Sequence, residues 1–283
     1  MPSVPAGEFD LVANVSLLFT ELPLLDRFSA AASAGFHSVE LWWPFADAVP
    51  IAADLVRLTS AISKSGIALR GMNLWAGDMA GGERGVVSLP DRRDQFEANV
   101  AVVAEIARAT GCRVFNALYG QRQPGLSKEL QEATAVTNLA LAARELGRVG
   151  GTVLLEPLSR GLNGDYPIQT VSDAIPLIQR ARETAGLKTI ALLFDTFHLS
   201  NNEDDLVAAI HLAGDFIGHV QVADAPGRGA PGTGAINFRA VFDALVEIGY
   251  SGAVSCEYLP NGQTEQSLGW IAEMNRPGFT LNA

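Results

Sequence analysis

The sequence predicts a single-domain (β/α)₈ barrel, in which eight parallel strands close on themselves and helices surround them. Two observations carry this prediction. Short apolar runs alternate with longer amphipathic runs along the whole chain, and repeated strand–helix alternation favours parallel pairing. The chain has 283 residues and is 48% hydrophobic, which suits one large core. Because no linker or composition break interrupts the sequence, we expect one domain over residues 1–283, with residues 1–9 as a frayed lead-in.

Eight apolar runs are the predicted strands. Most of them carry Val, Ile, Leu or Phe almost continuously, as strands covered on both faces do. In chain order they are Leu11–Leu18, Ser38–Trp42, Ala68–Leu74, Arg113–Leu118, Thr152–Glu156, Thr189–Asp195, Phe216–Val222 and Ala253–Glu257. Eight such units suit a closed barrel better than an open sheet.

Five segments between these runs have apolar residues at helical spacing, and each is followed by a glycine. They are Asp26–Ala34, Ala53–Ser65, Asp91–Thr110, Lys128–Val149 and Phe238–Ile248. A glycine just past a helix is the usual left-handed C-cap. The longest stretches without periodicity, 75–90 and 223–237, follow predicted strands. We therefore expect them as loops on the face where barrels carry their chemistry.

The composition argues against two classes of partner. The formal net charge is −11, whereas duplex DNA and anionic membranes attract a positive surface. No stretch approaches eighteen apolar residues, and the N-terminus lacks the basic and apolar parts of a secretion signal. Cys112 and Cys256 lie in apolar runs, which favours reduced thiols in a cytoplasmic protein. We expect a small-molecule substrate, no nucleic acid and no membrane; the sequence is compatible with a homo-oligomer without fixing one.

Oxygen-bearing side chains lie at the ends of the last four predicted strands. They are Glu156, Asp195, Gln221 and Glu257. Strand C-termini meet at one rim of a barrel, so the three carboxylates would repel one another unless they are protonated or neutralised. A bound divalent cation resolves that repulsion, and oxygen ligands suit Mg²⁺ or Mn²⁺ better than zinc. A single acid at a strand end more often caps a helix, but four equivalent positions favour a metal site.

Two histidines are placed near this rim. His198 follows Asp195 by three positions, which predicts a place in the next loop, where its imidazole can hydrogen-bond a substrate oxygen. The alternative is a histidine packed under a neighbouring side chain. His219 shares a strand face with Gln221, one layer deeper, and is expected to support the site rather than bind the metal.

Other polar residues are candidates for binding substrate. Arg84 and Arg228 lie in the two long loops, where each either offers a guanidinium fork to a substrate carboxylate or balances nearby acids. Glu40 ends the second strand and either lines the pocket or supports another site residue. Three asparagines near strand ends are either pocket donors or loop caps: Asn14, Asn73 and Asn116.

Short motifs spread along the chain carry a resemblance to a known family. They are Val12-Ala-Asn-Val-Ser-Leu-Leu-Phe19, Gly35-Phe-His-Ser-Val-Glu40, Asn73-Leu-Trp-Ala-Gly-Asp78, Gly82-Glu-Arg-Gly85, Leu155-Glu-Pro157, Asp195-Thr-Phe-His198, Gly218-His-Val-Gln-Val-Ala-Asp224, Pro231-Gly-Thr-Gly-Ala-Ile-Asn237 and Cys256-Glu-Tyr258. Together they resemble the hydroxypyruvate isomerase family, which belongs to the xylose-isomerase-like barrels. The resemblance runs from about Phe9 to Trp270 and is most specific between His219 and Asn237.

The resemblance implies conversion of hydroxypyruvate to tartronate semialdehyde, with Glu156 and Glu257 as proton donor and acceptor. It implies a metal site formed by Glu156, Asp195, Gln221 and Glu257, the set that the strand ends gave independently. One glutamate would remove a proton beside a carbonyl polarised by the cation, giving an enediolate, and a proton would return to the neighbouring carbon. Met72 stands where some members have histidine, which leaves the exact substrate open.

Other functions stay open at this point. An isomerase or epimerase of a longer 2-oxo acid or ketose would share the barrel, the metal and the glutamate pair, and a hydride shift could replace proton transfer. A phosphodiesterase of the endonuclease type would need more histidine ligands and a more basic surface than four histidines and a charge of −11 provide. A non-catalytic sugar-acid binding protein would not need acids at all these strand ends.

Overall fold

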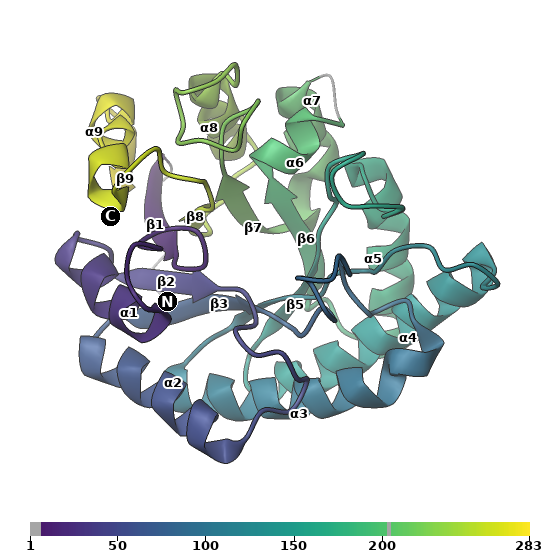
Figure 1. The fold of residues 1–283 in the computed structure, drawn as a ribbon. Helices are drawn as coiled ribbons and strands as arrows, with labels where there is room; N and C mark the ends of the chain where they lie inside the picture. The colour runs from purple at the N-terminus through teal and green to yellow at the C-terminus, as the bar shows by residue number, and fades with distance from the viewer. Residues whose placement is uncertain (1–6, 203–204) are drawn as a thin grey trace.

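The computed structural model describes residues 7–202 and 205–283 and has the predicted architecture (Figure 1). Its eight barrel strands pair in parallel in the order β2-β3-β4-β5-β6-β7-β8-β1, and β1 pairs back with β2 to close the barrel. The strands are β1 (Glu8–Asn14), β2 (Ser38–Leu41), β3 (Ala68–Asn73), β4 (Val114–Asn116), β5 (Thr152–Leu155), β6 (Ile190–Asp195), β7 (Ile217–Val222) and β8 (Val254–Cys256). The prediction of a single-domain (β/α)₈ barrel is confirmed.

Helices surround the strands (Figure 1). They are α1 (Leu24–Ser33), α2 (Ala52–Ser65), α3 (Arg93–Thr110), α4 (Lys128–Gly147), α5 (Val171–Ala185), α6 (Thr196–Ser200), α7 (Leu206–Ala213), α8 (Phe238–Glu247) and α9 (Trp270–Met274). Short 3₁₀ turns occupy Pro90–Arg92, Gly214–Phe216 and Thr264–Ser267. The predicted glycine C-caps are found at the ends of α2 and α3. Gly66 and Gly111 are left-handed there, with φ of 72° and 80°. No helix in the described ranges is long and apolar enough to cross a membrane.

The expectation of a frayed lead-in is wrong for Glu8 and Phe9. Both belong to β1, which extends outward to pair in parallel with an additional strand, β9 (Thr280–Asn282). Phe9 is buried, and its ring centroid lies 6.0 Å from that of Phe242 and 5.9 Å from that of Phe279. This aromatic packing offsets the entropy of ordering the segment. Residues 1–6 of the expected lead-in lie outside the described residues.

The core has two parts. A large cluster lies between the strands and the helices, and a small one consists of Leu154, Ala191 and Leu193 from neighbouring β5 and β6. Cys112 and Cys256 are both free and buried. The tight packing of the strands gives the polar side chains at their C-terminal ends a fixed base.

Candidate active site

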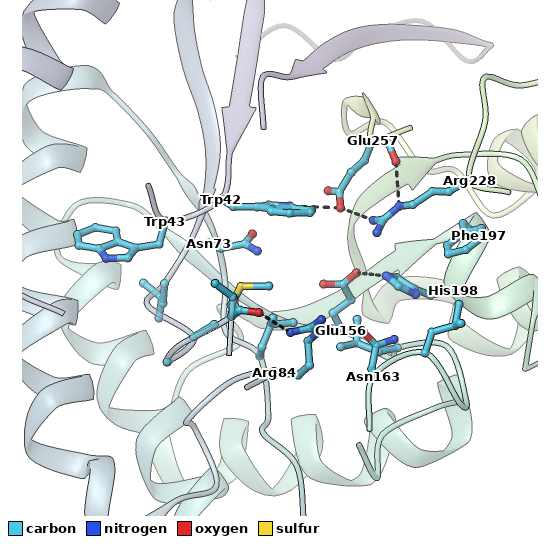
Figure 2. A pocket seen from close by; sticks show the side chains of 18 residues that line it. Trp42, Trp43, Asn73, Arg84, Glu156, Asn163, Phe197, His198, Arg228 and Glu257 are labelled. Carbon is cyan, nitrogen blue, oxygen red and sulfur yellow. Dashed lines mark hydrogen bonds and ion pairs between the residues drawn. The ribbon is translucent and has the colours of Figure 1, made fainter. Parts of the chain in front are cut away.

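A cavity of about 540 Å³ opens among the loops that follow the strands (Figure 2). Six of the nine predicted site residues line it: Asn73, Arg84, Glu156, His198, Arg228 and Glu257. The other three are buried and contact one another or the lining residues: Glu40, Asp195 and Gln221. The loops predicted to carry the chemistry therefore do meet around one space, and most of the expected side chains face it.

Glu156 and Asp195 lie side by side beneath this cavity at the ends of neighbouring strands. Asn116 Nδ2 donates to Glu156 Oε2 at 2.6 Å. Asp195 caps α6, because its Oδ1 accepts hydrogen bonds from the backbone N–H groups of Phe197 and His198 at 2.7 and 3.4 Å. Burial, helped by the negative charge of Asp195, raises the pKa of Glu156 to about 8, and burial raises the pKa of Asp195 to about 6. Two buried acids with raised pKa values thus lie at the ends of neighbouring strands.

Glu257, the fourth strand-end residue, is held by three donors. Arg228 Nη2 lies 2.5 Å from Glu257 Oε1, and Trp42 Nε1 donates to the same oxygen at 3.3 Å. Asn14 Nδ2 donates to Oε2 at 2.8 Å. Burial raises the pKa of Glu257 well above its ordinary value, while the Arg228 charge opposes that rise. Arg228 also lies 3.4 Å from Asp195 Oδ2, so this arginine balances two acids.

Gln221 is oriented by Glu40. Gln221 Nε2 donates to Glu40 Oε1 at 2.7 Å, while Gln221 Oε1 is buried and has no hydrogen-bond partner in the described chain. Glu40 also accepts from His219 Nε2 at 2.7 Å and from Asn14 Nδ2 at 2.9 Å. The structure therefore supports the second reading of Glu40, as an acid that holds other site residues, because Glu40 does not line the cavity.

His198 presents an N–H group to the acids. The backbone N–H of Ser159 donates to His198 Nδ1 at 3.1 Å, and Ser159 Oγ lies 2.8 Å from the same nitrogen. Because Nδ1 accepts a bond and burial lowers the pKa of His198 well below its ordinary value, the ring is neutral with its proton on Nε2. Nε2 lies 3.7 Å from both Glu156 Oε1 and Asp195 Oδ2. The residue is in α6 and not in a loop as expected, since Asp195 starts that helix.

Among the histidine, cysteine, aspartate and glutamate side chains of the described ranges, one group of three lies close enough together to hold a metal ion. Glu156, Asp195 and His198 each offer an atom within 4.8 Å of the others. This set shares two members with the predicted site and has His198 in place of Gln221 and Glu257. A nitrogen that binds a metal must offer a lone pair. His198 Nε2 could therefore bind the metal only after its proton moved to Nδ1, which would break the hydrogen bond from the Ser159 N–H.

The loop after β5 supplies two site residues that the sequence analysis missed, Ser159 and Asn163. Ser159 fixes the ring of His198, and Asn163 lines the cavity and accepts from Arg84 Nε at 3.3 Å. Both are small neutral residues in an aperiodic segment, so no charge or period in the sequence marks them. Trp42 and Phe197 cover the Arg228 guanidinium, at 6.0 and 5.3 Å from their ring centroids.

Known proteins share both this sequence and this fold. The family described as "Xylose isomerase-like TIM barrel" matches residues 28–274. A Streptomyces coelicolor protein provisionally named hydroxypyruvate isomerase is 44% identical, over 91% of this chain and 94% of its own. The Escherichia coli hydroxypyruvate isomerase is 35% identical, over 92% of this chain and 96% of its own. A Pectobacterium atrosepticum 2-oxo-tetronate isomerase is 34% identical, over 91% of this chain and 95% of its own.

A solved structure agrees in fold. A Brucella melitensis protein titled "AP endonuclease, family 2" superposes with a TM-score of 0.84 at 32% identity, covering 95% of this chain and 100% of that one. The family match spans most of the barrel, and the curated relatives are matched over nearly their full lengths. The chain belongs to the xylose isomerase-like TIM barrel family.

Proposed function

We propose that this chain is a metal-dependent isomerase of a short 2-oxo acid, interconverting hydroxypyruvate and tartronate semialdehyde. One observation carries the proposal: two buried carboxyls with raised pKa values, Glu156 and Glu257, face the same cavity. Carboxyls that are held together in one cavity by the fold are suited to general acid–base catalysis. Relatives at 35% to 44% identity are named for this reaction, which supports the choice of substrate.

Four side chains would hold the cation: Glu156, Asp195, Gln221 and Glu257. Gln221 supports this set, because its buried Oε1 has no partner among described residues while its Nε2 is tied to Glu40. The crowded acids support it too, since a divalent cation would stabilise their charged forms. His198 is left out because its Nε2 carries the proton. Four oxygen donors suit Mg²⁺ or Mn²⁺.

The reaction moves one carbon-bound proton. When bound, the cation supplies positive charge beside the substrate's carbonyl oxygen and makes the neighbouring C–H more acidic. Glu257 accepts the proton from C3, and the three donors on its oxygens oppose the effect of burial on its pKa and so favour the carboxylate form that this role needs. Glu156, whose pKa is raised to about 8, delivers a proton to C2. The C3–H bond breaks, a C2–H bond forms, and the hydroxyl proton of the C3 oxygen passes to the C2 oxygen.

His198 and Asn73 would bind the substrate's oxygen atoms. The Nε2–H of His198 faces the acids, where it can donate to the oxygen that gains negative charge in the enediolate. Asn73 ends β3 and lines the cavity, so its amide is available to a hydroxyl. Arg228 holds Glu257 and Asp195 in place and supplies positive charge beside them.

A four-carbon substrate is the second candidate. The cavity, at about 540 Å³, leaves room beyond a three-carbon acid, and the Pectobacterium relative is named a 2-oxo-tetronate isomerase. A nuclease has weaker support, although the Brucella structure carries such a title. The one group of His, Cys, Asp and Glu side chains in the described ranges that could hold a metal contains a single histidine, and the net charge of −11 opposes DNA binding.

The test is turnover of hydroxypyruvate, of four-carbon 2-oxo acids and of common ketoses, followed by NMR in D₂O. We expect a 2-oxo acid to be isomerised, a chelator to abolish turnover, and Mg²⁺ or Mn²⁺ to restore it. Solvent deuterium should enter at the carbon that gains hydrogen, whereas complete absence of solvent label would indicate a hydride shift. Turnover of no compound would overturn the proposal.

The proton acceptor is tested separately. Glu257→Gln keeps the side chain's size and removes its basicity, so kcat should fall by about 10²–10⁴-fold. Glu97→Gln on the exposed surface of α3 is the matched control and should leave kcat unchanged. Near-normal turnover by Glu257→Gln would show that Glu257 does not move the proton.

A further inference from the structure

Two guanidinium groups line the cavity, and acids neutralise only one of them. Arg228 lies within 3.4 Å of both Asp195 and Glu257. Arg84, from the loop after β3, has no carboxylate oxygen within 4.0 Å in the part of the chain that the structure describes. Figure 2 shows Arg84 beside Asn163 and Arg228 beside Glu257. The cavity thus has a balanced cation at one end and an unbalanced one at the other.

The acids closest to Arg84 in sequence are engaged elsewhere. Glu83 pairs with Arg92, Nη2 to Oε1, at 3.1 Å, and its Oε2 accepts from the backbone N–H of Asp78 at 2.6 Å. Asp78 Oδ1 accepts from the backbone N–H of Gly81 at 2.8 Å. These contacts turn both carboxylates away from the Arg84 guanidinium, so its positive charge is available to a bound anion.

Neutral acceptors hold the Arg84 guanidinium in place. Its Nε donates to Asn163 Oδ1 at 3.3 Å, and its Nη1 donates to the backbone carbonyls of Met79 and Glu83 at 3.0 and 2.7 Å. Its Nη2 makes no hydrogen bond to any described residue. Such contacts fix the direction of the group without cancelling its charge, which lowers the entropy lost when a ligand binds.

The loop that carries Arg84 is fixed at its base. Gly85 donates its N–H to Ala76 O at 2.9 Å and forms an antiparallel bridge with Tyr119 beyond β4. Its φ is 105°, and a Cβ at this position would lie 2.2 Å from Leu118 O. Only glycine allows this close approach, so the residue next to Arg84 has a defined position.

We propose that Arg84 binds the carboxylate of the substrate and thereby selects 2-oxo acids over neutral ketoses. This inference rests on the proposed function, which supplies a substrate with one carboxylate. A carboxylate in a partly buried pocket needs a fixed cation with free N–H donors. Arg228 is occupied by two acids, and His198 is neutral. Arg84 is the described lining residue that meets the requirement.

The loop after β5 connects Arg84 to the residues of the proposed proton transfer. Arg84 contacts Asn163, whose Nδ2 donates to Ser159 O at 3.0 Å, and the Ser159 N–H donates to His198 Nδ1 at 3.1 Å. A carboxylate on Arg84 therefore places the rest of the substrate at a set distance from the His198 Nε2–H. Arg84 acts on specificity through binding, with no part in the proton transfer.

The experiment compares a matched pair of unreactive ligands, glycerate and glycerol, which differ by one carboxylate. Calorimetry with the Mn²⁺-loaded enzyme should show that the wild type binds glycerate more tightly than glycerol. Arg84→Met should weaken glycerate binding by about 10- to 100-fold, the scale of a charge-assisted hydrogen bond, and leave glycerol binding unchanged. Arg108→Met, exposed on α3, is the control and should match the wild type.

Kinetics give a second readout. Arg84→Met should raise KM for the accepted 2-oxo acid by a similar factor with a smaller change in kcat. Arg84→Lys keeps the charge and loses the hydrogen bonds of Nε and Nη1 that fix the group, so it should give an intermediate KM and serve as the test if Arg84→Met does not fold. Equal binding of glycerate by the wild type and both variants, or equal binding of glycerate and glycerol by the wild type, would overturn the assignment. Failure of the wild type to isomerise any 2-oxo acid would refute the proposed function. The glycerate titration would still test whether Arg84 binds a carboxylate, because it does not depend on turnover.

Discussion

Glu40 is the acid on which three buried donors converge, and Glu40→Gln tests how far they depend on its charge. Its Oε2 accepts from His219, and its Oε1 accepts from Gln221 and Asn14, all within 2.9 Å. Burial alone would raise the pKa of Glu40, but the His219 charge and the hydrogen bonds lower it to about 2. The side chain is therefore a carboxylate in the folded protein at every ordinary pH.

The size of the effect follows from these contacts. In Glu40→Gln the amide oxygen can keep the bonds from Gln221 and Asn14, but an NH₂ group replaces the acceptor for His219. The variant loses one charge-assisted hydrogen bond, and we expect the free energy of unfolding near pH 7 to fall by about 2 kcal/mol. Because the folded pKa lies below the ordinary value of 4.5, the stabilisation by the charge is complete above about pH 4.5 and fades as the pH falls toward 2.

The assay is urea denaturation of the wild type and the variant followed by circular dichroism, near pH 7 and at steps down to pH 3. The difference in free energy of unfolding between the two proteins should be largest near pH 7 and should decrease below pH 4.5. Glu97→Gln, in which an exposed glutamate is changed, should show a gap near zero throughout. A gap that stays constant with pH, or one below about 0.5 kcal/mol near pH 7, would refute the reasoning, since either would mean that the carboxylate charge does not stabilise the fold.

Three further predictions follow from other parts of the structure. Because the pKa values of Glu156 and Asp195 are raised to about 8 and about 6, Mn²⁺ should displace protons and bind more tightly as the pH rises from 6 to 8; titration calorimetry in buffers of different ionisation enthalpy measures this, and pH-independent affinity would contradict it. Gly85→Ala should lower stability by about 1–3 kcal/mol in urea denaturation, because its Cβ would meet Leu118 O and its φ of 105° is strained for alanine; an unchanged midpoint would count against the fixed loop. Phe9→Ala should cost about 3–5 kcal/mol in the same assay, since it empties a fully buried aromatic site, and a cost below about 1 kcal/mol would mean that the outer part of β1 does not support the barrel.

The sequence predicts the barrel well because the features that define it are local. Each strand is a short apolar run buried on both faces, and each run is visible without knowledge of its neighbours. The strand-end residues are also predictable, because a barrel brings every strand C-terminus to one rim. Glu156 and Glu257 therefore face one cavity, although they are a hundred residues apart in the sequence.

Contacts between distant segments explain what the sequence does not predict. His198 looks like a loop residue until Asp195 is seen to cap α6 with its side chain. The strand β9 is apolar only at Leu281, and it forms because β1 offers an open edge beside it. The two arginines look equivalent in sequence, and their different roles follow only from which acids the fold places beside each one.

The pairing of β1 with β9 has a practical consequence for engineering this barrel. Glu8 lies opposite Thr280 and Asp10 opposite Asn282, at the start of β1 and hence on the side of the barrel remote from the candidate active site. Because the two segments run parallel, a peptide that joins the end of β9 to the start of β1 must cross back along the pair, which takes about a dozen residues, with new ends opened in a surface loop elsewhere. The paired ends of β1 and β9 are thus a suitable place for circular permutation with such a linker, and a solid support attached there would leave the mouth of the cavity free.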